Sequence, residues 1–137
     1  MISNYNIKIG LLKIYNNTDI YFIKNNNIRI LHLCYDIDIE TMKILSNLIQ
    51  NNKTLTSLYL NNNINAEYIS KSIEHNKSIV HMLLENNSIT DIGALKLINA
   101  VMNNKKILVL GIWSDKMSDR IEDEYDKMEY ELFNRDY

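Results

Sequence analysis

The sequence predicts an α/β fold in which a strand-and-helix unit repeats, so that parallel strands form one layer and helices form the other. One spacing of apolar residues recurs four times, as Ile28-x-x-Leu31-x-Leu33, Leu55-x-x-Leu58-x-Leu60, Ile79-x-x-Met82-x-Leu84 and Ile107-x-x-Leu110-x-Ile112. These segments begin at positions 28, 55, 79 and 107, which gives repeat lengths of 27, 24 and 28 residues. Three of them follow a similar joint, namely Asn51-Asn52-Lys53, His75-Asn76-Lys77 and Asn103-Asn104-Lys105.

The first half of each unit is predicted to be a short strand. The best-formed example runs from Ile79 to Ile89, where apolar residues occupy the first, fourth, sixth and last positions. Because the side chains of a strand alternate between its two faces, the framework residues point into the core. The residues between them, such as His81 and Leu83, are expected on the opposite face of the sheet.

The second half of each unit is predicted to be a helix. Between Asp91 and Met102, the residues Leu95, Ile98 and Met102 fall on one helical face, and Thr90 or Asp91 can cap the start. Residues 40–50 and 66–74 repeat this pattern. A lysine after each helix complements the negative end of the helix dipole, so we interpret the Asn-Lys joints as helix ends.

The two ends of the chain are predicted to close the repeat. Ile2-x-x-Tyr5-x-Ile7 fits the frame loosely, and residues 19–24 can form the matching helix of a degenerate first unit. At the other end, residues 118–133 are predicted to form an acidic amphipathic helix, which either covers the apolar last strand or docks on a partner. The predicted organisation is therefore a repeat body over residues 1–114 and a helical segment over 115–137, with units near 2–27, 28–54, 55–78, 79–106 and 107–114.

The chain resembles leucine-rich repeat proteins of the ribonuclease-inhibitor-like type. The resemblance rests on the apolar frame, on Asn63 and Asn87, and on the helix opening Ile-x-x-x-Gly-Ala-x-x-Leu from Ile89 to Leu97. Asp36 departs from it, because the pattern has asparagine there. The resemblance implies a short leucine-rich-repeat solenoid with parallel β-strands on the concave face, α-helices on the convex face and a C-terminal capping helix. It also implies a surface used for binding.

Composition limits the classes of function. The net charge of −2 gives no reason to expect a nucleic-acid partner, although residues 115–137 hold nine acidic and four basic residues. A single cysteine, Cys34, and the lack of a signal peptide or an 18-residue apolar stretch indicate a cytoplasmic setting, which includes the cytoplasm of a host cell. The bias toward Asn, Ile, Lys and Tyr is typical of an AT-rich genome.

No catalytic or metal site is predicted, and no cofactor. His32 and His81 are expected two strands apart, roughly 10 Å, which is too far for them to share one zinc with Cys34 at bond lengths of about 2 Å. Phosphate-binding loops and paired catalytic acids have no match in the sequence.

The predicted function is that of a non-enzymatic protein–protein interaction module, an adaptor, a scaffold or a host-directed effector, with no membrane contact. The face of a sheet of four or five strands is too small to supply the ~800 Å² per partner that a standard interface buries. The rims of the sheet are therefore expected to contribute contact area. One alternative is a self-assembling protein that pairs through its C-terminal edge and helix. Another, less favoured, is a regulator of a small GTPase that uses Arg29. The residues predicted to bind the partner are Ile30, His32, Tyr59, Asn61, His81, Leu83, Glu85 and Trp113.

Overall fold

The computed structural model describes residues 5–6, 10–24, 27–60, 65–84, 88–112, 114 and 116–135, and every structural statement below concerns these ranges. One sheet holds six strands in the order β1 to β6: β1 (Tyr5–Asn6), β2 (Leu11–Ile14), β3 (Ile30–Leu33), β4 (Ser57–Leu60), β5 (His81–Leu83) and β6 (Val109–Gly111). Strands β2 to β6 are parallel, and β1 pairs antiparallel with β2. The predicted α/β class with a parallel sheet is confirmed.

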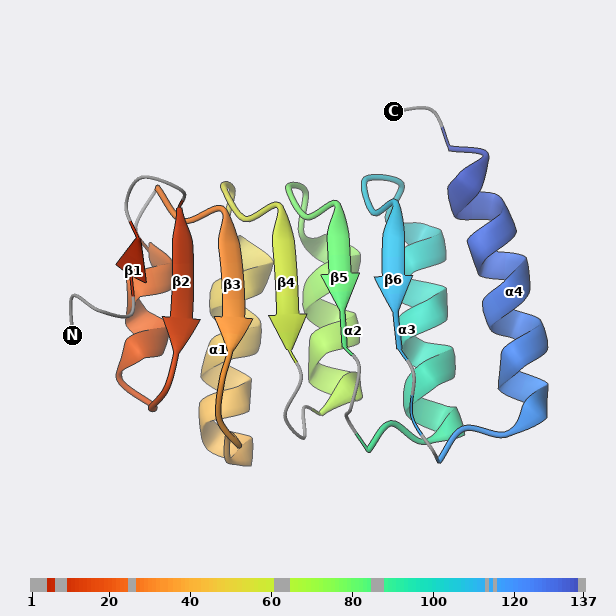
Figure 1. The fold of residues 1–137 in the computed structure, drawn as a ribbon, viewed down its shortest axis with the longest axis horizontal. Helices are drawn as coiled ribbons and strands as arrows, with labels where there is room; N and C mark the ends of the chain where they lie inside the picture. The colour runs from red at the N-terminus through yellow and green to blue at the C-terminus, as the bar shows by residue number, and fades with distance from the viewer. Residues whose placement is uncertain are drawn as a thin grey trace.

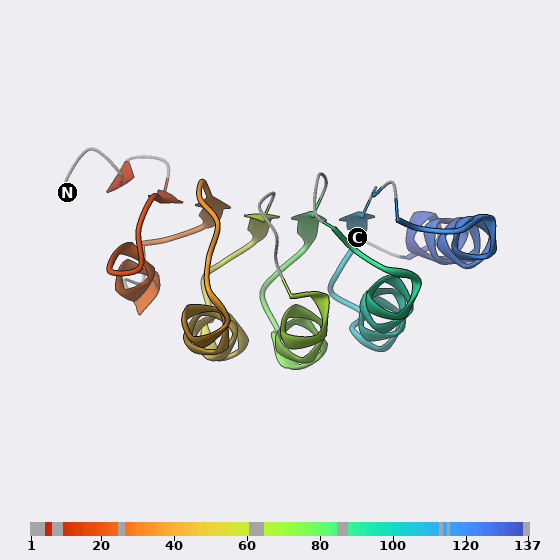
Figure 2. The same cartoon turned by 90° about the horizontal axis from the view of Figure 1, so that it is seen from below.

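The helices cover one face of this sheet. The 3₁₀ helix η2 (Asp19–Lys24) and the α-helices α1 (Ile39–Asn51), α2 (Ala66–His75) and α3 (Asp91–Asn103) each connect two neighbouring strands. The strands lie side by side in Figure 1, and Figure 2 shows them as one layer with these helices as a second layer beneath. The last helix, α4 (Asp119–Phe133), stands beside β6 and is raised toward the level of the sheet (Figure 2).

Each of the helices α1, α2 and α3 begins with a side-chain N-cap. The Asp38 carboxylate accepts a hydrogen bond of 2.8 Å from the backbone N–H of Thr41, and the Thr90 hydroxyl accepts one from Gly93. Asn65 caps α2 in the same way. Each cap satisfies a backbone donor that has no partner within the helix. The helices predicted near 40–50, 66–74, 91–102 and 118–133 are therefore confirmed, with ends that differ by one residue.

The apolar framework forms the core, as the alternation predicts. Leu31, Leu58 and Met82 occupy matching positions of neighbouring strands and are fully buried, and Leu12 and Leu110 extend this row in both directions. Burying one such side chain contributes roughly 1.5–3 kcal/mol relative to leaving it in water. The spacing of these residues therefore accounts for both the parallel register and the face that the helices cover.

A row of asparagines, one in each joint, connects successive units through hydrogen bonds. We call Asn52, Asn76 and Asn104 the asparagine ladder. The buried Asn76 amide donates to the carbonyls of Ile49 at 2.8 Å and Asn52 at 3.0 Å, and its oxygen accepts from the N–H groups of Ser78 and Ile79, both at 2.8 Å. Equivalent donor bonds join Asn52 to Ile23, and Asn104 to Ile73 and Asn76. Asparagine at the joint thus ties each unit to the preceding one.

The lysines of the joints have a smaller role than these asparagines. Lys53 and Lys77 are exposed, and the Lys105 ammonium lies 2.9 Å from the carboxylate of Glu131 on α4. Exposed ion pairs of this kind contribute about 0–1 kcal/mol. The feature that the joints share is therefore the hydrogen bonding of the asparagine amide to the preceding unit, which a helix-dipole argument does not detect.

The position of the first parallel strand differs from the prediction. The prediction placed it around Tyr5, but Tyr5 lies in the antiparallel strand β1, and β2 begins at Leu11; Ile2 and Ile7 lie outside the described residues. The frame that fits β2 is Ile9-x-x-Leu12-x-Ile14, which has the same spacing as the later units. Gly10 precedes β2 with a φ of 64°, a conformation that glycine adopts without strain, and its carbonyl accepts from Arg29 and Ile30.

Helix α4 packs on the end of the repeat through its apolar stripe. Ile121, Met128 and Leu132 are buried, and the Tyr125 hydroxyl donates to the Leu110 carbonyl at 2.6 Å. That carbonyl belongs to the outer edge of β6, so the bond occupies part of an open sheet edge. The Asp91 carboxylate on α3 accepts hydrogen bonds from the N–H and the hydroxyl of Ser118, which holds the start of α4.

Arg135 follows α4 and completes the asparagine ladder. Its guanidinium donates to the carbonyls of Asn104 at 2.9 Å, Ile107 at 2.6 Å and Val101 at 2.9 Å. Asn104 and Val101 correspond in the repeat to Asn76 and Ile73, whose carbonyls receive the amide of Asn104. Arg135 therefore takes the place that the amide of a further ladder asparagine would occupy.

Candidate functional site

The face of the sheet opposite the helices carries two rows of side chains, which we call the open face. The strand register places Leu11, Ile30, Ser57, His81 and Val109 in one row, and Lys13, His32, Tyr59, Leu83 and Gly111 in the other. Both rows lie between the buried framework residues, as strand alternation requires. The open face is therefore a mixed surface of aliphatic, aromatic and basic groups.

In the second row of the open face, His32, Tyr59 and Leu83 are half-buried. In the first row, exposure increases toward the C-terminal end, because Ile30 is half-buried whereas His81 is exposed. Val109 is 39% exposed. A cluster of half-exposed apolar and aromatic groups is the composition typical of the centre of a protein interface.

His32 and Tyr59 form an aromatic pair in the second row. Their ring centroids lie 6.0 Å apart with an interplanar angle of 66°, an edge-to-face arrangement. Such pairs contribute about 0.5–1.5 kcal/mol beyond the burial of their area, so the two rings hold each other in place. The pair is therefore a pre-ordered aromatic surface on the open face.

Partial burial lowers the pKa of His32 below its ordinary value of 6.5, and the Lys13 ammonium in the same row lowers it further. His32 is therefore neutral at neutral pH. We expect the ring protons of His32 to titrate by NMR with a midpoint below 6.5. Lys13→Gln should raise that midpoint without restoring it fully, since burial is the larger cause.

Lys71→Gln is the control for this titration, because Lys71 is exposed on α2 on the opposite side of the sheet and should leave the midpoint unchanged. A His32 midpoint that responds equally to both substitutions would contradict the arrangement of the second row.

The structure brings five of the eight predicted binding residues onto the open face, namely Ile30, His32, Tyr59, His81 and Leu83. Asn61, Glu85 and Trp113 lie outside the described residues. The prediction missed Lys13, because it placed the first parallel strand around Tyr5. The spacing Ile9-x-x-Leu12-x-Ile14 is the signal that would have found it.

Cys34 and Arg29, the side chains with the most reactive or most basic groups among those discussed above, both lie next to backbone carbonyls. Cys34 is half-buried after β3, with its thiol 3.6 Å from the carbonyl oxygen of His32. Arg29 is exposed, and its guanidinium lies 3.4 Å from the Thr54 carbonyl. Across the described ranges, His, Cys, Asp and Glu do not gather into any group of three that could hold a metal ion.

Each helix in the described ranges is too short or too polar to span a membrane.

The comparison with known proteins gives a likeness of fold. The solved structure of the leiomodin-1 actin-binding site 2 matches with a TM-score of 0.73 and 13% sequence identity over 97% of this chain and 86% of that one. The tropomodulin C-terminal domain of Caenorhabditis elegans matches with a TM-score of 0.71 and 18% identity over 95% of this chain and 87% of that one. No protein-family model and no curated protein sequence matches the chain.

These findings correct the resemblance drawn from the sequence. The prediction of a ribonuclease-inhibitor-like leucine-rich repeat protein is wrong, because the structures found to be similar include the leiomodin and tropomodulin domains and not that protein type. The apolar frame records where strands and helices bury their side chains, and different families satisfy that packing requirement with the same spacing. At 13% and 18% identity the likeness extends to the fold alone.

Proposed function

We propose that this chain is a non-enzymatic protein-binding domain that contacts its partner through the open face. The observation that carries the proposal is the alignment of His32, Tyr59 and Leu83 in one row beside His81 and Val109 in the other. This arrangement supplies an aromatic pair for the centre of an interface and polar groups for its border. Such a surface is sufficient for an adaptor or a scaffold, which binds other proteins without catalytic groups.

Actin is the first partner to test, because the similar structure of leiomodin-1 is that of an actin-binding site and its likeness extends over 97% of this chain. The proposal includes the finer description of the fold, a short solenoid of strand-and-helix units over residues 1–114 that residues 115–137 close. This description is supported by Asn52, Asn76 and Asn104, each of which lies three residues before the first apolar framework residue of a unit. Because the sheet is small, the rims are proposed to add contact area.

Two other functions considered from the sequence have less support. Strand addition at β6 meets an obstacle, since the Tyr125 hydroxyl occupies the edge carbonyl of Leu110. Regulation of a GTPase through Arg29 would require that side chain to leave the Thr54 carbonyl. Neither function is part of the proposal.

The test is a binding titration against monomeric actin, together with co-sedimentation with actin filaments. We expect the wild-type chain to bind one of the two forms. The double substitution Tyr59→Ala with His81→Ala should weaken that binding by about tenfold or more, because truncating central aromatic residues of an interface typically costs 1–2 kcal/mol or more.

The control variant also replaces one tyrosine and one histidine by alanine, but on the helical side of the molecule. Tyr21 is 53% exposed on η2 and His75 is exposed at the end of α2, so Tyr21→Ala with His75→Ala should leave binding within about twofold. Circular dichroism checks that both variants are folded. Equal losses in the two variants would rule out the open face, and a wild-type chain that binds neither form would rule out actin.

A further inference from the structure

A groove separates α4 from the edge of β6 and meets the open face at Val109. One half is a hollow of about 380 Å³ with an apolar floor of Ile112, Met117, Ile121 and Tyr125. The other half, about 590 Å³, is lined by Leu108, Val109, Leu110, Leu132 and Phe133. Asp126 and Glu129 line both halves, so the two hollows adjoin along the helix.

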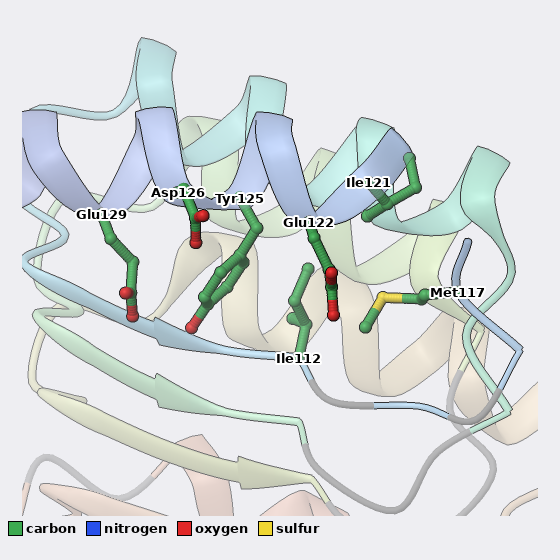
Figure 3. A pocket seen from close by; sticks show the side chains of 7 residues that line it. All are labelled: Ile112, Met117, Ile121, Glu122, Tyr125, Asp126 and Glu129. Atoms are coloured by element: carbon green, nitrogen blue, oxygen red, sulfur yellow. The ribbon is translucent and has the colours of Figure 1, made fainter. Parts of the chain in front are cut away.

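One wall of this groove is a row of carboxylates. Glu122, Asp126 and Glu129 are spaced four and three residues apart, which places them on one side of α4. Figure 3 shows their side chains on the side of the helix that faces β6, beside Tyr125. All three are exposed, and within the described ranges none of them is part of an ion pair. The groove therefore combines an apolar floor with a negatively charged wall.

Exposed aromatic side chains continue the apolar surface at one end of the groove. Phe133 is 84% exposed and Tyr130 is 75% exposed, and both line the half of the groove next to Val109. Aromatic groups this exposed contribute nothing to the core, and they are enriched among the residues that anchor interfaces. A partner that covers them removes apolar surface from water at the same place where it meets the carboxylates.

We infer that the groove between α4 and β6 binds a short basic segment of a partner protein in an extended conformation. In an extended segment, every second side chain is on the same side and about 6.6 Å from the next, close to the ~6 Å that separates Glu122 from Asp126 along the helix axis. Lysines or arginines at alternate positions would meet the carboxylate row. Apolar residues between them would lie over β6 and Phe133.

The charge distribution favours this partner over a second copy of the chain. Residues 115–137 carry a net charge of −5, so two copies of this end repel each other. The carboxylates attract cations over about 8 Å at physiological salt, which is enough to orient a basic segment before contact. The apolar floor then favours basic segments that also carry apolar side chains over segments that carry charge alone.

The probe is a fluorescein-labelled peptide of about eight residues in which Lys and Leu alternate, measured by fluorescence anisotropy at about 0.15 M salt. A peptide of the same composition ordered Lys-Lys-Leu-Leu keeps the charge and loses the extended spacing. We expect the full chain to bind the alternating peptide at least about threefold more tightly than the blocked peptide.

Matched variants on α4 test the groove itself. Asp126→Asn with Glu129→Gln should weaken binding of the alternating peptide by about tenfold. Asp123→Asn with Glu124→Gln removes the same residue types and the same charge from positions of the same helix that do not line the groove, and should change binding by less than about twofold. Phe133→Ser should weaken binding several-fold, which attraction by charge alone does not predict.

Three results would overturn the inference. Equal losses in the two double variants, or equal affinity for the two peptides, would show attraction by net charge alone. Light scattering that shows a dimer which dissociates in the Asp126 and Glu129 variant would assign the groove to a second copy. Substitutions on the open face, such as Tyr59→Ala with His81→Ala, should leave peptide binding unchanged, so failure of the actin proposal and failure of this one are distinguishable.

Discussion

Replacing Asn76 by alanine is expected to lower the free energy of unfolding by about 3–5 kcal/mol. Asn76 is 1% exposed, and its amide bonds two carbonyls of the preceding joint and two N–H groups of its own. Alanine leaves the N–H groups of Ser78 and Ile79 without this acceptor. The carbonyls of Ile49 and Asn52 keep only longer bonds, from the Asn52 N–H at 3.2 Å and the Ser78 hydroxyl at 3.4 Å. A buried donor or acceptor that loses its partner costs about 1–3 kcal/mol, and the separate losses do not add fully.

Asn76→Asp separates the donor function from packing. Aspartate keeps the shape and the acceptor oxygen, but directs a carboxylate at the carbonyls of Ile49 and Asn52 in place of the amide donor. We expect it to destabilise the protein at neutral pH at least as much as alanine does. Urea denaturation with an unchanged m-value measures both effects.

Asn51→Ala is the control, because Asn51 is exposed at the end of α1 and its amide donates to the carbonyl and the side-chain oxygen of Asn47 in the same helix. It should change stability by less than about 0.5 kcal/mol. Similar losses for Asn51→Ala and Asn76→Ala would contradict the role assigned to the ladder.

Arg135→Ala has the second-largest expected effect, a loss of about 2–4 kcal/mol. The Arg135 side chain is 8% exposed and donates to the carbonyls of Asn104, Ile107, Val101 and Met102. Its charge also meets the Glu131 carboxylate at 3.1 Å. Alanine would leave the last carbonyls of α3 without a donor, and these form the negative end of the helix dipole.

Arg135→Lys should recover only part of this stability, because an ammonium supplies the charge without the planar fork that reaches several carbonyls at once. The measurement is again urea denaturation. Arg120 is exposed in the first turn of α4, so Arg120→Ala should cost less than about 0.5 kcal/mol. Full recovery by lysine would show that charge, rather than the geometry of the guanidinium, stabilises this end.

The apolar frame was sufficient to predict the strands β3 to β6, their register and the four α-helices. Each of these features follows from which residues are buried, and a period of two or of 3.6 residues reports that directly. The same spacing puts His32 and Tyr59, and likewise Ser57 and His81, at corresponding positions of neighbouring units, and these residues are paired in the strand register. Because this information concerns packing, it did not identify the family.

Features made by polar side chains were harder to predict. The Asn-Lys joints were visible in the sequence, but periodicity could not show that Asn76 is buried and bonds two other joints. Arg135 looked like one charge in an acidic tail, since its partners lie about 30 positions away in the sequence. The groove beside α4 likewise depends on where that helix packs, which its own stripe of apolar residues leaves open.

The asparagine ladder also bears on how the protein loses its structure. Each amide reaches back to the carbonyls of the joint before it, so a unit that melts alone leaves an unsatisfied donor in the next unit. Partial opening is therefore costly in the middle of the chain, and the units are coupled more strongly than by apolar contact between neighbours. We expect hydrogen exchange at Leu55, Ile79 and Ile107 to proceed with one common free energy, as in a single cooperative unit.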